Sequence, residues 1–132
     1  MESLTVRSRQ ESEFINITRE TRSMVNASGI MNGSLFLYVP HTTAGITINE
    51  SADINVEHDI LADLDRLFPR RQSYYRHAEG NSASHMKASL MGSGVRVMIQ
   101  DGDLVLGTWQ GIFFCEFDGP RTRRVHVHLY EA

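Results

Sequence analysis

The chain has 132 residues, enough for one domain with a buried core and too few for two. Hydrophobic residues make up 41% and charged residues 22%, proportions that are ordinary for a globular protein. The formal net charge of -3 argues against a nucleic-acid-binding protein or a protein of acidic membrane surfaces, because such proteins usually present a basic face. We therefore expect a single domain over residues 1–132.

The first half of the chain is predicted to mix short strands with two helices. In chain order the expected elements are a strand near Leu4–Arg7, a strand over Glu13–Ile17, a helix from an N-cap at about Thr18 to Ser28, strands over Ser34–Val39 and Thr42–Ile48, and a helix capped by Asp53 that runs to about Phe68. Gly29 and Pro69 end the two helices, since glycine adopts the left-handed turn that closes a helix and proline cannot continue one.

The second half is predicted to begin with one helix and then to consist of strands. Ser82 is a good N-cap for a helix over Ala83–Met91, and Gly92 ends it. The strands that follow are expected over Gly94–Gln100, Leu104–Trp109, Gly111–Phe117 and Arg123–Tyr130. Asp101 and Gly102 form a strong hairpin signal. With about seven or eight strands in all, this antiparallel order favours an α+β fold over alternating β-α-β units.

Cysteine content and hydropathy indicate the cellular compartment in which the protein is expected. Cys115 is the single cysteine, so no intrachain disulfide can form and a reducing compartment suits the chain best. The segment from Glu2 to Arg9 is polar and lacks the apolar stretch of a secretory signal. No run of about 18 apolar residues occurs that could span a membrane. We expect a cytoplasmic protein with no membrane partner.

The segment from His77 to His85 holds the densest group of reactive side chains. Two imidazoles, the Glu79 carboxylate and the Asn81 carboxamide fall together just before a predicted helix start. Imidazoles can ligate a metal or donate hydrogen bonds, and a helix N-terminus offers free N–H groups to an anion. A polar loop leading into a surface helix explains any one of these residues alone. Together they favour a metal or phosphate site.

His41 and the pair Asn49-Glu50 stand at opposite ends of the predicted strand Thr42–Ile48. Site residues often occupy such strand ends, although an exposed loop histidine is the simpler interpretation of His41. At about 3.3 Å per residue, the strand separates the two ends by roughly 25–30 Å. They share one pocket only if the chain bends, for example at Gly45, or if they meet across a subunit interface.

Trp109 and Gln110 interrupt two apolar strands. Trp109 has the ring to stack on a ligand, and Gln110 has an amide to hydrogen-bond one. A β-bulge with Trp109 in the core is the structural alternative.

Glu116 lies in the very apolar segment Ile112–Phe117 and shares a strand face with Phe114. A carboxylate there costs free energy unless it is paired or functional. We expect it to be buried, as a metal ligand, a base, or the partner of Arg121 or Arg123.

Three blocks of the chain resemble a known family. They are His41–Glu50 (HTTAGITINE), Glu79–Gly92 (EGNSASHMKASLMG) and Leu106–Arg121 (LGTWQGIFFCEFDGPR). In order and spacing they resemble the YjbQ-like family, often labelled secondary thiamine-phosphate synthase, and the match runs from about Leu4 to Leu129. One departure is Ser84, which stands where an alanine directly before the histidine is expected.

The resemblance implies an α+β subunit built as a two-sheet β-sandwich, which assembles as a homotrimer with sites near the subunit interfaces. It also implies weak thiamine-phosphate synthesis, in which a thiazole phosphate nitrogen attacks the methylene of a pyrimidine pyrophosphate and pyrophosphate leaves. Such chemistry requires cationic or metal stabilisation of the leaving group and an aromatic platform for the pyrimidine.

On this basis each candidate residue receives an expected role. The catalytic residues are expected to be His41, His85 and Glu116. The residues expected to bind the small phosphorylated substrate are Thr42, Asn49, Glu50, Asn81, Trp109, Gln110 and Arg121. A divalent metal, Zn or Mg, is expected to be held by His41, His77 and His85. A metal-dependent hydrolase and a non-catalytic trimeric ligand-binding protein stay open as alternatives.

Overall fold

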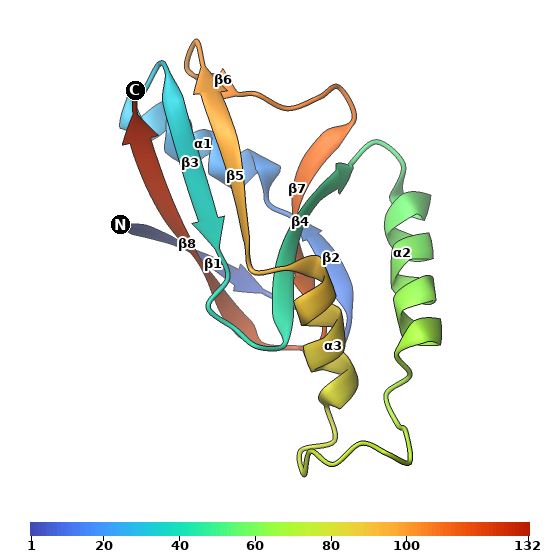
Figure 1. Cartoon of the computed structure of the whole chain (residues 1–132). Coiled ribbons are helices and arrows are strands. Elements are labelled where there is room, and N and C mark those ends of the chain that lie inside the picture. The colour runs from blue at the N-terminus through green and yellow to red at the C-terminus, as the bar shows by residue number, and fades with distance from the viewer.

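A computed structural model describes all 132 residues and contains eight strands and three helices. In chain order these are β1 (Glu2–Arg7), β2 (Glu13–Asn16), α1 (Thr18–Ser28), β3 (Gly33–Tyr38), β4 (Ala44–Glu50), α2 (Ile54–Leu67), α3 (Ser82–Met91), β5 (Gly94–Gln100), β6 (Asp103–Leu104), β7 (Gln110–Glu116) and β8 (Thr122–Glu131). One sheet has the strand order β1-β8-β3-β5-β6 and the other has the order β2-β7-β4, and every pairing is antiparallel (Figure 1). The predicted two-sheet α+β fold is confirmed.

The main core lies between the two sheets. Side chains such as Leu35 and Val125 of the five-stranded sheet meet Ile46 and Phe114 of the three-stranded sheet there. The opposite face of the three-stranded sheet is covered by α2 and α3, which form a second, smaller core with it. Strand β7 is therefore buried on both faces, which explains why Ile112–Phe117 is almost continuously apolar.

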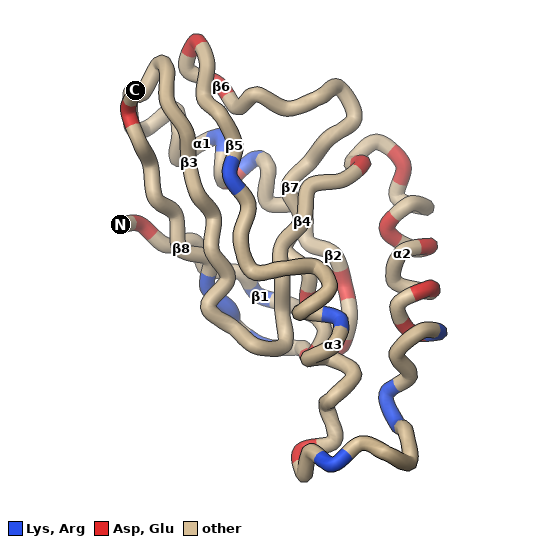
Figure 2. Tube along the Cα trace, viewed as in Figure 1, with Lys and Arg blue, Asp and Glu red and all other residues tan.

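Helix α2 is attached to the body mainly through side chains. Leu64 of α2 is buried in the second core, and the buried Lys87 of α3 forms an ion pair with Asp65 of α2. Figure 2 shows acidic residues along α2 and basic residues in the connection between α2 and α3. No helix in the structure has the length and apolar character needed to cross a membrane.

Some predicted boundaries were wrong. The strand expected over Leu104–Trp109 is reduced to β6, because residues 105–109 pair with no strand and are largely exposed. Ser82 is the first residue of α3 and not its cap, and the N-cap of α1 is Ile17 and not Thr18. The cap at Asp53 is confirmed, since its carboxylate accepts the N–H of Asn55 at 2.9 Å.

Gly45 is needed for close packing and not for a bend. Strand β4 runs through it without interruption, so the two ends of β4 stay apart. A Cβ at Gly45 would lie 2.8 Å from the carbonyl oxygen of Gly92 and 3.0 Å from Cβ of Met91. The N–H of Ile46 also donates to the Gly92 carbonyl at 3.0 Å. This contact fixes the C-terminal end of α3 on β4.

Replacing Gly45 with alanine is expected to lower the free energy of unfolding by roughly 1–3 kcal/mol, because the added methyl group overpacks the junction with backbone atoms. Gly107→Ala is the matched control, since the nearest atoms to a Cβ there belong to the flexible side chain of Gln110. Urea unfolding of both variants measures the difference. Equal stability of the two variants would contradict the close-packing role.

Candidate functional site

A cavity of about 430 Å³ opens at one end of the sandwich and gathers three separate chain segments. It is lined by the segment after β3, by the approach to α3 with the first turn of that helix, and by the β7–β8 connection with the start of β8. The lining residues are Pro40, His41, Thr42, Thr43, His77, Glu79, Asn81, His85, Asp118, Arg121 and Arg123. The three histidines that were predicted to act together therefore lie around one cavity.

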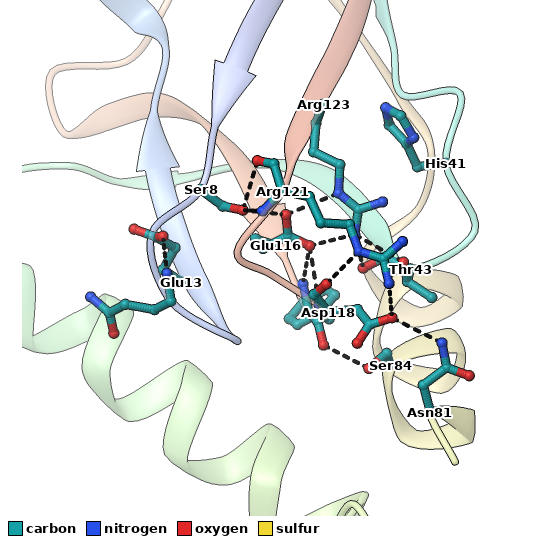
Figure 3. A network of polar contacts seen from close by, with 12 residues as sticks. Ser8, Glu13, His41, Thr43, Asn81, Ser84, Glu116, Asp118, Arg121 and Arg123 are labelled. Atoms are coloured by element: carbon teal, nitrogen blue, oxygen red, sulfur yellow. Dashed lines mark hydrogen bonds and ion pairs between the residues drawn. The ribbon is translucent and has the colours of Figure 1, made fainter. Parts of the chain in front are cut away.

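The floor of the site is a buried ion pair between Glu116 of β7 and Arg123 of β8. Their side chains are 0% and 4% exposed, and the guanidinium contacts the carboxylate through both Nε and Nη2 (Figure 3). Glu116 was predicted to be buried, and the structure confirms this. It pairs with Arg123, one of the two arginines considered. Glu116 is not among the cavity-lining residues, so it supports the site without reaching a ligand.

The Glu116 carboxylate accepts five hydrogen bonds. Besides the two from Arg123, the Ser8 hydroxyl donates at 2.7 Å, and the backbone N–H groups of Phe117 and Asp118 donate at 3.1 and 3.0 Å. Burial alone would raise the pKa of this carboxyl, but the hydrogen bonds from Arg123, Ser8 and Asp118 and the charge of Arg123 outweigh burial and lower it. Glu116 is therefore an anion at neutral pH.

Arg123 is held firmly and still has a free edge. Its Nη2 donates to the Thr43 hydroxyl at 2.9 Å as well as to Glu116. Its Nη1 makes no hydrogen bond within the chain and is not closed off from solvent. Since Arg123 lines the cavity, Nη1 offers two N–H donors to a ligand there.

His41 is fixed in one tautomer. The backbone N–H of Arg124 donates to Nε2 of His41 at 2.9 Å, so Nε2 is an acceptor and the ring proton lies on Nδ1. Burial, followed by the positive charge of Arg123, lowers the pKa of His41 despite the opposing effect of Glu116. At neutral pH His41 is an uncharged imidazole that donates from Nδ1.

Asp118 ties Asn81 and Arg121 to the rim of the cavity. Its Oδ2 accepts from Nδ2 of Asn81 at 2.9 Å and from Nη2 of Arg121 at 2.8 Å. The Asp118 carbonyl also accepts from Nε of Arg121 at 2.8 Å. The Arg121 side chain is half exposed, so it stays accessible to an anion in the cavity.

The predicted metal lacks a ligand set within one chain. No group of three or more His, Cys, Asp or Glu side chains is arranged to hold a metal ion. The rings of His77 and His85 meet edge to face with centroids 5.4 Å apart, but Nε2 of His41 already accepts a backbone N–H. The residues present do not fit the predicted three-histidine centre.

Four predicted substrate-binding residues lie at the opposite end of the three-stranded sheet. In the β4–β7 pairing Ala44 is opposite Glu116 at the cavity end, and Glu50 is opposite Gln110 at the far end. Asn49 and Trp109 belong to the far end as well, and Trp109 is 64% exposed, so its alternative place in the core is wrong. Gln110 is engaged locally, since its side-chain oxygen accepts the Gly107 N–H.

Sequence reasoning missed several members of the network, namely Ser8, Thr43 and Asp118. It also left Arg123 as one of two alternatives. The alternation of β8 contained the signal for Arg123, because this residue is in phase with the inward-facing Val125 and Val127. Ser8 and Asp118 lie in loops, where periodicity gives no information about direction.

Replacing Glu116 with glutamine is expected to lower the free energy of unfolding by roughly 3–5 kcal/mol at neutral pH, because Arg123 would keep a buried charge without its partner. The pKa of Glu116 is lowered on folding, so its stabilisation is present above the unfolded value of 4.5 and is lost as the pH falls further. In denaturant unfolding, the difference in the free energy of unfolding between the wild type and Glu116→Gln should therefore be smaller below pH 4.5 than at pH 7. Glu20→Gln on the exposed face of α1 is the control. If both variants lost the same free energy of unfolding, the buried ion pair would be contradicted.

The histidine tautomer can be observed directly. We expect ¹⁵N-edited NMR to show His41 protonated on Nδ1 at pH 7 and to titrate with a midpoint below 6.5, the usual histidine pKa. The assignment uses a His41→Gln variant, in which this signal is missing. A proton on Nε2 would disprove the hydrogen bond from Arg124, and a midpoint above 6.5 would contradict the effect of burial and of Arg123 on the pKa of His41.

Residues 2–132 match the family described as "UPF0047 protein YjbQ-like". UPF0047 protein YugU of Bacillus subtilis (strain 168) is 46% identical over 129 residues, which cover 98% of each chain. UPF0047 protein MJ1081 of Methanocaldococcus jannaschii is 47% identical over 124 residues, 94% of this chain and 89% of that protein.

Solved structures agree with these sequence matches. The crystal structure of a conserved YjbQ/UPF0047-family protein from Clostridium acetobutylicum is 48% identical, covers 98% of this chain and 100% of its own, and superposes with a TM-score of 0.95. The conserved hypothetical protein TT1486 of Thermus thermophilus is 42% identical with the same coverage and a TM-score of 0.92. The resemblance of the three sequence blocks is thereby confirmed, and the chain belongs to the YjbQ-like UPF0047 family.

Proposed function

We propose that this protein is a weak thiamine-phosphate synthase-like transferase, active in the cytoplasm, that joins a pyrimidine pyrophosphate to a thiazole phosphate. The thiazole ring nitrogen attacks the methylene carbon, the bond from that carbon to the pyrophosphate oxygen breaks, and pyrophosphate leaves with the bonding electrons. The main requirement is stabilisation of the negative charge that develops on the leaving group.

The observation that supports this proposal best is the convergence of Arg123, Arg121 and His41 on one cavity. Arg123 presents Nη1 from a fixed position, and Arg121 adds a second guanidinium at the rim. His41 adds an uncharged N–H donor, because Nε2 accepts from the backbone. Donors held in place by the fold suit a phosphate or pyrophosphate group, since they need little reorganisation when charge develops.

Two of the expected catalytic residues have distinct roles in this proposal. His85, in the first turn of α3 beside His77, donates a proton or a hydrogen bond to the departing pyrophosphate. Glu116 acts as a positioning residue, because it holds the Arg123 guanidinium and is itself closed off from the cavity. The metal-dependent hydrolase is less well supported, since a single chain offers no ligand set.

A homotrimer would complete the site. The outer face of the five-stranded sheet exposes Tyr38, Met98 and Tyr130, an apolar surface that a second copy could cover. The far end of the three-stranded sheet, with the exposed Trp109, would then be available to a neighbouring copy's cavity. We propose that the Trp109 side chain of a neighbouring copy supplies the aromatic platform for the pyrimidine. The cavity within one chain has no aromatic residue other than its histidines.

The activity is tested with the purified protein, a pyrimidine pyrophosphate and a thiazole phosphate, with thiamine phosphate and pyrophosphate measured as products. Arg121→Gln is expected to reduce kcat/KM by roughly 10²-fold, because a charged donor to the leaving group is lost. Arg19→Gln, an exposed arginine on α1 outside the cavity, should leave kcat/KM unchanged. Binding of either substrate without product would favour the non-catalytic ligand-binding alternative.

Multi-angle light scattering at micromolar concentration tests the assembly. We expect three times the chain mass of 14.9 kDa. Met98→Glu should shift the protein towards monomer, since it places a charge on the proposed buried surface. A monomeric wild-type protein would rule out the shared site.

A further inference from the structure

One buried atom of the cavity wall has no partner. Asn81 is 5% exposed, and its Oδ1 is the only buried side-chain nitrogen or oxygen in the chain without a hydrogen bond. Folded proteins satisfy nearly all such atoms, so an exception at a cavity is informative. Asn81 lines the same cavity as the arginines and histidines.

The orientation of the Asn81 amide is fixed by its neighbours. Nδ2 donates to Oδ2 of Asp118 at 2.9 Å, and the reversed amide would place two oxygens against each other. Figure 3 shows the amide oxygen turned away from Asp118. Asn81 also occupies the N-cap of α3 without using its side chain as a cap, although asparagine is among the preferred capping residues. Oδ1 is thus an acceptor that the chain leaves unused.

We propose that Asn81 Oδ1 accepts a hydrogen bond from the amino group of an amino-substituted heterocycle, and that this contact makes the cavity selective for such ligands. The inference rests on the proposed function, because it places the pyrimidine pyrophosphate in this cavity. It adds the ring substituent that the site recognises, an amino group, and the residue that recognises it, Asn81.

The charges around Asn81 favour an uncharged donor over a cation. Arg121 lies against the same carboxylate group as Asn81, and Arg123 lines the same cavity. The carboxylates of Glu79 and Asp118 line the cavity too, but Asp118 is neutralised by Arg121 and is hydrogen-bonded to Asn81. The guanidinium groups of Arg121 and Arg123 are left to attract an anionic tail. A ligand with a neutral N–H at one end and phosphate groups at the other matches both features.

The ligand must displace a covering group to reach this oxygen, because the atom is closed off from solvent in the ligand-free chain. His77 and Glu79, in the segment just before α3, are exposed cavity-lining residues. Neither side chain makes a hydrogen bond within the chain, although the His77 ring packs edge to face against His85. The lining around Asn81 must therefore shift when the heterocycle enters.

The inference is tested by isothermal titration calorimetry of the wild-type protein with two ligands. One is the aminopyrimidine pyrophosphate, and the other is the analogue in which hydrogen replaces the amino group. We expect the analogue to bind about tenfold or more weakly, because Oδ1 then stays unpaired. Equal affinities would overturn the inference and leave the proposed function standing, whereas no binding of either compound would overturn both.

A double-mutant cycle assigns the discrimination to Asn81. In Asn81→Ala the preference for the amino compound should fall to near unity, since the unused acceptor is gone. Asn55→Ala, on the distant helix α2, should keep the wild-type preference. An unchanged preference in a folded Asn81→Ala variant would overturn the assignment; if that variant does not fold, the two-ligand comparison on the wild type decides.

Discussion

The ion pair between Glu116 and Arg123 joins the two sheets of this fold, because Glu116 belongs to the three-stranded sheet and Arg123 to the five-stranded sheet. Two charges inside a sandwich would be costly if their hydrogen-bonding capacity were unmet. Ser8 follows β1 and Thr43 precedes β4, and each adds a hydrogen bond to the pair. The network closes the end of the sandwich with polar groups. It also orients the free edge of Arg123 at the cavity, so the contacts that stabilise the buried charges also position this guanidinium.

Periodicity in the sequence was sufficient to predict most of the fold. Seven of the eight strands and all three helices lie where alternation, helical spacing and terminating residues placed them. The failures are local. A strand over Leu104–Trp109 requires a partner strand, and hydropathy carries no information about strand pairing. The caps at Ile17 and Asn81 were missed because neither side chain forms a hydrogen bond with its helix.

The candidate site was predicted in part, and the missing part has a geometric reason. His41, His77 and His85 lie around one cavity because α3 packs its first turn beside the segment that precedes β4. Asn49 and Glu50 do not reach it, because β4 extends without a bend and carries them to the far end. The length of a strand can be predicted from the sequence, but the residues that surround each of its ends cannot.

Helix α3 separates the histidine cavity from a second hollow that lies between α3 and α2. Asn81 and His85 face the first, while Lys87 faces the second and is tied to Asp65 of α2. The backbone hydrogen bonds of α3 join these two faces, so the ion pair at Lys87 helps to fix the helix that carries His85 and is capped by Asn81. The acidic helix α2 thus contributes to the shape of the histidine cavity through this one ion pair, although none of its residues lines that cavity.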